Sequence, residues 1–144
     1  MLSRRRFFQV GSSWALSPLI GHAACEDGLS QFRSGSTAEE VTSGIDLTGK
    51  TALVTGVNSG IGYETMRVLA LRGAHVIGTA RTEEKGRMAC DSVEGMTTPL
   101  VLELSDFGSV VECADSVSKM GMPIDMLICN AGAIFSELRQ INGI

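Results

Sequence analysis

The sequence predicts an α/β protein with a parallel, doubly wound sheet, of which the chain contains the first four strands. Short apolar runs with β-branched residues alternate along the chain with longer segments of helical apolar spacing. A glycine-rich turn joins the first apolar run to the first helical segment. The length of 144 residues and the formal net charge of −4 fit one soluble domain at most.

The first strand is expected at Thr51–Val54, followed by a glycine-rich turn over Thr55–Gly62. A helix with Met66 and Leu69 on its apolar face comes next, and Gly73 ends it. Glycine lets a backbone turn tightly and leaves no Cβ between the chain and a bound group. The start of a helix offers unpaired N–H groups and a partial positive charge, which suit a pyrophosphate. The alternative is a βα turn that binds nothing.

A second strand is expected at Ala74–Thr79, and Ala80 and Arg81 follow it. In many dinucleotide-binding folds an acidic residue at this point binds the ribose 2′-OH, whereas an arginine accommodates a 2′-phosphate. No acidic residue stands here, and the guanidinium of Arg81 can bind a phosphate with two hydrogen bonds. The sequence therefore favours NADP over NAD, with a solvated loop arginine as the alternative.

The third βα unit is weaker in its pattern. A polar helix interrupted by Gly86 is expected over Thr82–Asp91. Pro99 is expected to break the segment that follows, so that only Leu100–Leu102 forms the third strand.

The next helix is predicted by an apolar stripe at helical spacing, which we expect to face the core. Ser105 is a candidate for its N-cap, and Gly121 with Pro123 ends it. The fourth strand is expected at Ile124–Cys129. The stripe consists of Phe107, Val110, Val111, Ala114, Val117 and Met120.

Two motifs together indicate a family. Thr55 begins the motif Thr-Gly-x-x-x-Gly-Ile-Gly, and Asn130, Ala131 and Gly132 follow the expected fourth strand. The pair resembles the short-chain dehydrogenase/reductase family, which has a Rossmann-type fold. The resemblance extends from about Ile45 to the end of the chain and covers the front half of the family's domain. The segment around the end of the first helix, together with the arginine after the second strand, is most similar to the retinol-dehydrogenase-like branch.

The resemblance implies hydride transfer between a nicotinamide and an alcohol or carbonyl carbon of a small-molecule substrate. NADP is the expected cofactor and NAD the less favoured one. The pyrophosphate is expected at the glycine turn, the 2′-phosphate at Arg81 and the nicotinamide side at Asn130–Gly132. Glu103 and Leu104 are expected near the adenine, although the family usually has an aspartate where Glu103 stands. The cofactor-binding residues of the turn are Gly56, Asn58, Ser59, Gly60, Ile61 and Gly62.

The catalytic residues of the family have no counterparts in this sequence. The family uses a serine on a later strand and a Tyr-x-x-x-Lys pair, whereas Tyr63 is followed four residues later by Arg67. Ser136 and Asn142 come too early to be the catalytic serine and asparagine. We therefore assign no catalytic residue and expect the chain alone to be inactive. The alternatives are a non-catalytic module that binds nucleotide or pairs through its fourth strand, for example as a homo-oligomer, and a βα domain without a ligand.

The N-terminus resembles an export signal of the twin-arginine type. Arg4 and Arg5 follow a serine, and the uncharged run over Val10–Ile20 is shorter than the roughly 20 apolar residues that span a bilayer. Small residues permit cleavage after Ala23. Lipidation at Cys25 and a mis-assigned start codon are the alternatives.

These features divide the chain into a signal segment (1–23), a linker (24–44) with one helical turn at Ala38–Val41, and an NAD(P)-binding domain (45–144). The signal predicts a transient membrane contact and a periplasmic or exported protein, or a cytoplasmic one where the signal is not used.

Composition bears on the remaining partners. The mildly negative charge argues against nucleic acid, which requires clustered Lys and Arg. The cysteines form no Cys-x-x-Cys pair, so small buried hydrophobes are the favoured interpretation and a disulfide or metal site is the alternative. They are Cys25, Cys90, Cys113 and Cys129.

Overall fold

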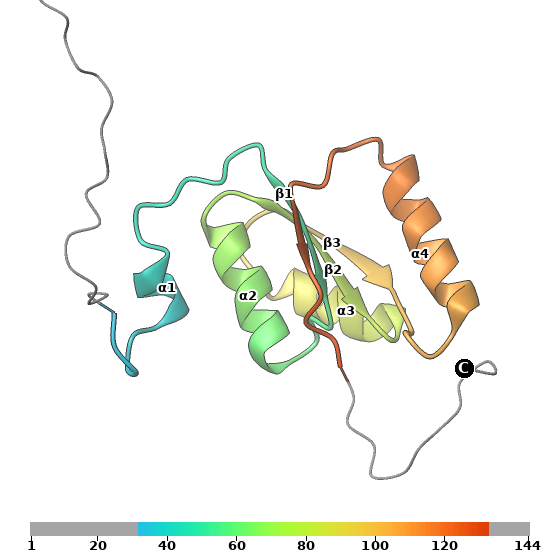
Figure 1. Ribbon diagram of the computed structural model, residues 1–144, viewed down its shortest axis with the longest axis horizontal. Helices are drawn as coiled ribbons and strands as arrows, with labels where there is room; N and C mark the ends of the chain where they lie inside the picture. Colours follow the sequence, from blue (N-terminus) through green and yellow to red (C-terminus); the bar gives the residue numbers. More distant parts are fainter. Residues whose placement is uncertain (1–31, 133–144) are drawn as a thin grey trace, which may run out of the picture. The chain divides into compact units, whose positions relative to one another are not determined.

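The computed structural model describes residues 32–132, in which helices flank both sides of a four-stranded sheet (Figure 1). The strand order is β3-β2-β1-β4 and all three pairings are parallel, which confirms the predicted Rossmann-like α/β fold. The elements are α1 (Ala38–Val41), β1 (Thr51–Thr55), α2 (Gly60–Leu71), β2 (His75–Ala80), α3 (Glu83–Asp91), β3 (Thr97–Val101), α4 (Phe107–Lys119) and β4 (Met126–Ile128). The expected signal segment lies outside the described residues.

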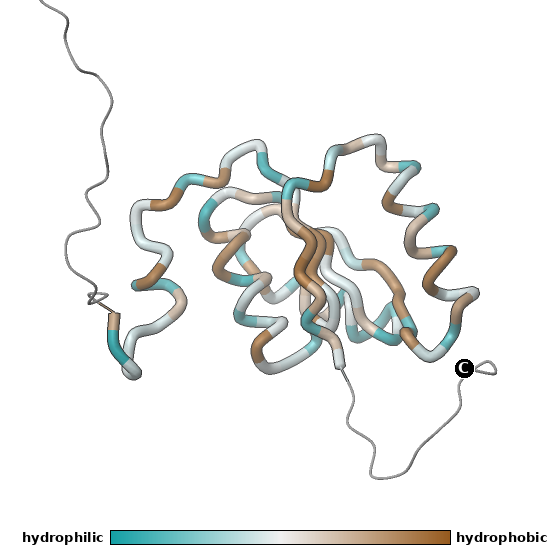
Figure 2. The backbone as a smooth tube through the Cα atoms, in the orientation of Figure 1, coloured by the Kyte–Doolittle hydropathy of each residue, from teal (hydrophilic) through white to brown (hydrophobic). Residues whose placement is uncertain are grey.

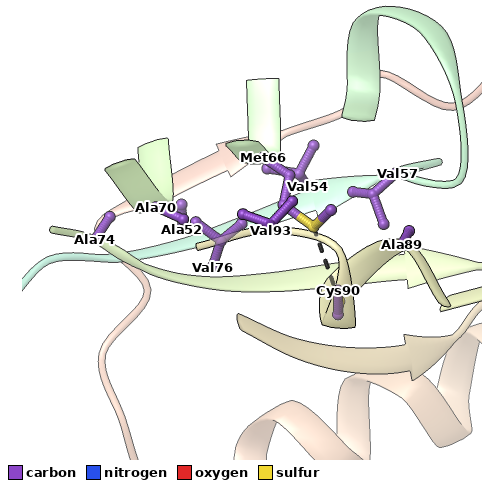
Figure 3. Close-up of a cluster of buried hydrophobic side chains, with 10 residues drawn as sticks. All are labelled: Ala52, Val54, Val57, Met66, Ala70, Ala74, Val76, Ala89, Cys90 and Val93. Carbon is purple, nitrogen blue, oxygen red and sulfur yellow. Dashed lines mark hydrogen bonds between the residues drawn. The ribbon is translucent and has the colours of Figure 1, made fainter. Parts of the chain in front are cut away.

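The main core lies between the sheet and the helices α2 and α3. All five residues of β1 are buried, as expected for a parallel strand covered on both faces. Met66 of α2 is 0% exposed and belongs to the same buried cluster as Val54 and Val76. The thiol Sγ of Cys90 on α3 lies 3.8 Å from Sδ of Met66 (Figure 3). Hydrophobic residues accordingly gather along the central strands (Figure 2).

β3 differs from its prediction because Pro99 lies inside the strand. The carbonyl of Met96 accepts from the N–H of Val76 at 2.8 Å, and the N–H of Leu102 donates to the carbonyl of Ala80 at 2.9 Å. Alternate residues of a parallel strand bond to the same neighbour, so the nitrogen of Pro99 faces away from β2. Proline is tolerated at such a position, and the expected break is wrong.

α3 also differs, because it runs through Gly86 without interruption. Gly86 is buried, and a Cβ built on it would lie 3.5 Å from Cβ of Pro99 and 3.6 Å from Cβ of Ala80. These are ordinary van der Waals distances, so an alanine would also fit here, and the close packing of the helix on the sheet does not depend on the glycine.

α4 lies on the opposite side of the sheet from α2 (Figure 1). Its N-cap is Asp106, whose carboxylate accepts from the N–H of Gly108 at 2.9 Å. Ser105 is therefore not the cap, and its hydroxyl donates instead to Glu103 Oε1 at 2.8 Å.

The apolar stripe of α4 is covered less than expected. Cys113 is the buried residue of this helix, whereas Val110, Val117 and Met120 are half-buried. Ala114 is exposed, Phe107 is 52% exposed and Val111 is 59% exposed, so for these three the predicted core position is wrong. In the described part of the chain, this side of the helix is thus largely exposed.

β4 is shorter than the predicted Ile124–Cys129. Asp125 precedes it, and its carboxylate accepts from the N–H of Thr51 and from Lys50 Nζ, both at 2.9 Å. Leu127 is 64% exposed. The pair with Lys50 thus joins the amino ends of β1 and β4.

α1 forms where a helical turn was expected, with Thr37 and Glu40 in a capping box. Two arginines hold it, one in α2 and one at its C-cap. Arg67 Nη2 of α2 pairs with Glu39 Oε2 at 3.1 Å, and Nη2 of the C-cap residue Arg72 donates to the carbonyl of Glu39 at 2.6 Å. Residues just before the expected domain start therefore contact its first long helix.

The cysteines divide into two groups. Cys90 and Cys113 are free and buried, as expected, whereas Cys129 is exposed. Cys25 lies outside the described residues. No helix within residues 32–132 is both long and apolar enough to cross a bilayer.

Candidate cofactor-binding site

The glycine turn begins where β1 ends. Gly56 and Gly60 have φ angles of 73° and 61°, which lie in the left-handed region that glycine adopts without strain. The N–H groups of Gly56 and Val57 both donate to the carbonyl of Thr79 on β2, at 2.9 and 3.0 Å. The turn therefore lies at the carboxyl edge of the sheet, between β2 on one side of β1 and β4 on the other. In open α/β sheets this switch in strand order creates the crevice where ligands bind.

The closest backbone approach in the turn is at Gly62. A Cβ at this position would overlap the carbonyl oxygen of Gly56 and Nδ2 of Asn130, and would lie 3.0 Å from the carbonyl carbon of Gly56. The first turn of α2 can pack so closely only because residue 62 lacks a side chain.

The second motif closes the turn from the side of β4. Asn130 Nδ2 donates to the carbonyl of Thr55 at 2.9 Å and to that of Gly56 at 3.4 Å. The N–H of Ala131 donates to Thr55 Oγ1 at 2.9 Å. The two motifs from distant parts of the sequence thus form one unit. In the sequence, Thr55 was only the first residue of a motif and had no predicted role. Its place directly before the first glycine is the signal that could have indicated its contacts with Asn130 and Ala131.

The N-terminus of α2 lies at this edge of the sheet and has no side-chain cap. Ser59 is the N-cap residue, but its hydroxyl makes no capping hydrogen bond, and no acidic residue lies in the first turn. The first N–H groups of a helix have no intrahelical acceptors and create a positive potential. Asn58 is exposed and Ile61 is 80% exposed. The turn can therefore accept an anion through its backbone.

A second group of expected residues lies at the carboxyl ends of β2 and β3. Arg81 is exposed and directly follows β2, while Glu103 and Leu104 follow β3. Glu103 Oε1 accepts from the N–H and the hydroxyl of Ser105, at 3.0 and 2.8 Å. These two donors hold the pKa of Glu103 below its ordinary value, and the positive charge of Arg81 adds to this effect. Leu104 is 52% exposed.

All twelve expected cofactor-binding residues thus lie at the carboxyl edge of the parallel sheet. Gly132 is exposed, and a Cβ there would have open space around it. Tyr63, which we excluded as a catalytic residue, shares a hydrogen bond of 2.9 Å with the hydroxyl of Ser92. Ser136 and Asn142 lie outside the described residues. Within residues 32–132, no group of three His, Cys, Asp or Glu side chains could hold a metal ion.

Comparison with known proteins agrees with this architecture. The chain is 38% identical over 122 residues to "Short-chain dehydrogenase TIC 32 B, chloroplastic" of Brassica napus. This alignment covers 81% of the present chain and 38% of the Brassica protein. It is 37% identical over 112 residues to the "WW domain-containing oxidoreductase" of Gallus gallus. This alignment covers 74% of the present chain and 27% of the chicken protein. A crystal structure of a metagenomic short-chain oxidoreductase in complex with NADP superposes with a TM-score of 0.57 at 33% identity, over 60% of this chain and 41% of that one.

The chain spans between 27% and 41% of the length of these relatives. The sequence profile of the family described as short chain dehydrogenase matches residues 50–142, which is more than half of the chain. This match covers the four-stranded sheet, the glycine turn and the asparagine that closes it. The chain therefore belongs to the short-chain dehydrogenase family of oxidoreductases.

Proposed function

We propose that this chain binds NADP as the nucleotide-binding part of a short-chain oxidoreductase of the retinol-dehydrogenase-like type. The bound nicotinamide would supply or accept a hydride at an alcohol or carbonyl carbon of a small molecule. This chain's own residues would hold and orient the nucleotide.

The observation behind the proposal is the packing of Gly62 against the carbonyl of Gly56 and the amide of Asn130. It fixes the uncapped start of α2 directly beside the turn, so that the unpaired backbone N–H groups of the helix lie at the carboxyl edge of the sheet. A diphosphate needs such a surface, because its oxygens accept from backbone N–H groups and its charge favours a helix N-terminus. The residues present therefore fit a dinucleotide.

The preference for NADP is supported by Arg81. An arginine after the second strand offers a planar fork of donors for a 2′-phosphate, and Ala80 before it offers no acid for a 2′-OH. The NADP in the metagenomic relative is consistent with this preference.

Turnover is not expected from the 144-residue chain itself. Its one tyrosine, Tyr63, lies in α2 and faces Ser92, and residue 67 is an arginine rather than a lysine. No proton donor with the family's Tyr-x-x-x-Lys arrangement is present in the sequence. The chain should therefore bind NADP without oxidising an alcohol.

The test compares two glycines that share a backbone conformation. Gly60 and Gly121 have φ angles of 61° and 64°, and both have open space where a Cβ would stand. Gly60→Leu and Gly121→Leu should cost similar stability, roughly 1–2 kcal/mol for a left-handed residue. Only Gly60 belongs to the proposed phosphate-binding turn, so Gly60→Leu should weaken NADP binding at least about tenfold in calorimetric titration, a loss of about 1.4 kcal/mol.

Two outcomes would contradict the proposal. The first is a wild-type chain that shows neither binding heat nor thermal stabilisation with NADP or NAD. The second is a folded Gly60→Leu variant that binds NADP as tightly as the Gly121→Leu control does.

The second candidate is a non-catalytic module that pairs with another subunit, including a second copy of itself. It is favoured by β4, which among the described strands pairs only with β1 and whose Leu127 is 64% exposed. Size-exclusion chromatography of the chain tests self-pairing, because a defined complex supports it and a monomer excludes pairing with a second copy.

A further inference from the structure

We propose that Glu103 is a specificity-determining residue, whose fixed carboxylate beside Arg81 weakens binding of a 2′-phosphate and so narrows the preference for NADP over NAD. This inference rests on the proposed nucleotide-binding function. It changes the role of Glu103 from an adenine neighbour to a group that opposes the arginine.

The sheet places the two residues side by side. Ala80 of β2 is in register with Val101 of β3, and the N–H of Leu102 donates to the carbonyl of Ala80 at 2.9 Å. Neighbouring strands lie about 4.8 Å apart. Arg81 directly follows Ala80, and Glu103 comes two residues after Val101, so both leave the same corner of the sheet.

Glu103 is held in place, whereas Arg81 is available. The backbone N–H of Glu103 donates to Ser109 Oγ at 3.0 Å, and its Oε1 accepts twice from Ser105. Within the part of the chain that the structure describes, Arg81 makes no hydrogen bond and no ion pair within 4.0 Å. The arginine is thus free to bind a ligand, while the carboxylate cannot easily turn away.

The two charges already influence each other. Besides the donors of Ser105, the positive charge of Arg81 contributes to the lowered pKa of Glu103, so the carboxylate is ionised at neutral pH. A phosphate monoester brought to Arg81 carries a charge of about −1.5 to −2 and would be repelled by Glu103. The ribose 2′-OH of NAD is neutral and can donate a hydrogen bond to a carboxylate. Glu103 should therefore disfavour NADP and leave NAD unaffected or favour it.

A substitution can remove the charge and keep the local structure. Glu103→Gln retains an Oε1 acceptor for the two donors of Ser105, so both hydrogen bonds in the loop before α4 are kept. Glu94→Gln is the matched control, because it removes the same charge from an exposed residue that precedes β3, at the opposite end of the strand. Arg81→Ala serves as the reference for loss of the phosphate partner.

The experiment measures the dissociation constants of NADP and NAD for each full-length chain by calorimetry at low ionic strength. Their ratio is the decisive quantity, since both nucleotides bind the same folded population and any loss of stability cancels. Glu103→Gln should raise the preference for NADP about three- to tenfold, as expected for a charge pair several ångströms apart in a solvated site. Glu94→Gln should leave the preference unchanged, and Arg81→Ala should lower it.

The outcomes separate this inference from the proposed function. If both nucleotides bind the wild-type chain and Glu103→Gln leaves their ratio unchanged, the inference is wrong and the proposed function stands. An equal rise with Glu94→Gln would also overturn it, because the effect would then be one of net charge. If neither nucleotide binds the wild-type chain, both fail.

Discussion

Gly62→Ala is the substitution that should most damage the turn. One added methyl group would overlap the carbonyl oxygen of Gly56 and Nδ2 of Asn130. The first of these belongs to the backbone, so it cannot move without shifting the turn that the carbonyl of Thr79 holds through two hydrogen bonds. The second can move only by weakening the bonds of Asn130 to Thr55 and Gly56.

The cost can be worked out from these contacts. Overpacking a filled site costs about 1–3 kcal/mol. Displacing Asn130 adds about 0.5–1.5 kcal/mol for its stronger hydrogen bond, the one of 2.9 Å to Thr55. The expected loss is therefore about 2–4 kcal/mol, a large part of the roughly 5–15 kcal/mol that stabilises a typical domain. With a urea dependence of about 2 kcal/mol per molar, in the middle of the usual range, the unfolding midpoint should fall by about 1–2 M.

The assay is urea unfolding, with Gly35→Ala as the matched control. A Cβ at Gly35 would meet nothing within 4 Å, so the same chemical change should leave the midpoint nearly unaltered. In an Asn130→Ala background one of the two overlaps is absent, so Gly62→Ala should cost about 1 kcal/mol less than in the wild type. If Gly62→Ala and Gly35→Ala unfold at the same urea concentration, the close packing of the turn is refuted.

Two further predictions concern the core and the sheet's amino edge. Met66→Ala removes a side chain that is 0% exposed and should lower the unfolding free energy by about 2–5 kcal/mol. Met88→Ala, at a residue 66% exposed, should change it by at most about 0.5 kcal/mol, and equal losses would contradict the assigned core. The N–H of Thr51 and then Lys50 hold the pKa of Asp125 below its ordinary value of 3.8. Its ionised form therefore stabilises the fold above pH 3.8, and this contribution is lost as the pH falls through the lowered pKa. Asp125→Asn should accordingly unfold at lower urea than the wild type at pH 7 and approach it in acid, whereas a gap that persists in acid would contradict the assignment.

The sequence predicted those parts of the fold that local patterns determine. The alternation of apolar runs and helical segments located every element, and α1 occupies the predicted helical turn, because a capping box is complete within four residues. The glycine motif predicted where the chain would turn tightly. The resemblance to a known family, rather than periodicity, brought Asn130 into the site.

The errors have non-local causes. Whether Pro99 breaks a strand depends on which neighbour its nitrogen faces, and that is set by pairing with β2. Gly86 was expected to interrupt a helix, yet it is buried where α3 packs on the sheet, and such tertiary packing outweighs the low helix propensity of glycine. The spacing of Phe107 and Val111 shows that they share a face of α4, but periodicity does not say what covers that face. The interaction of Asn130 with the turn joins residues 74 and 75 positions apart, so no window of sequence contains it.

The hydrogen bonds from Asn130 and Ala131 to Thr55 connect the proposed ligand-binding turn to β4, the shortest strand of the described sheet. β4 has three residues and pairs with β1 alone among the described strands. Its detachment would pull Asn130 away from the carbonyls of Thr55 and Gly56, so the strand can leave only when these bonds to the glycine turn break. A dinucleotide bound at the turn, as proposed above, would therefore slow hydrogen exchange at Met126–Ile128, and the amides of β4 would report its binding.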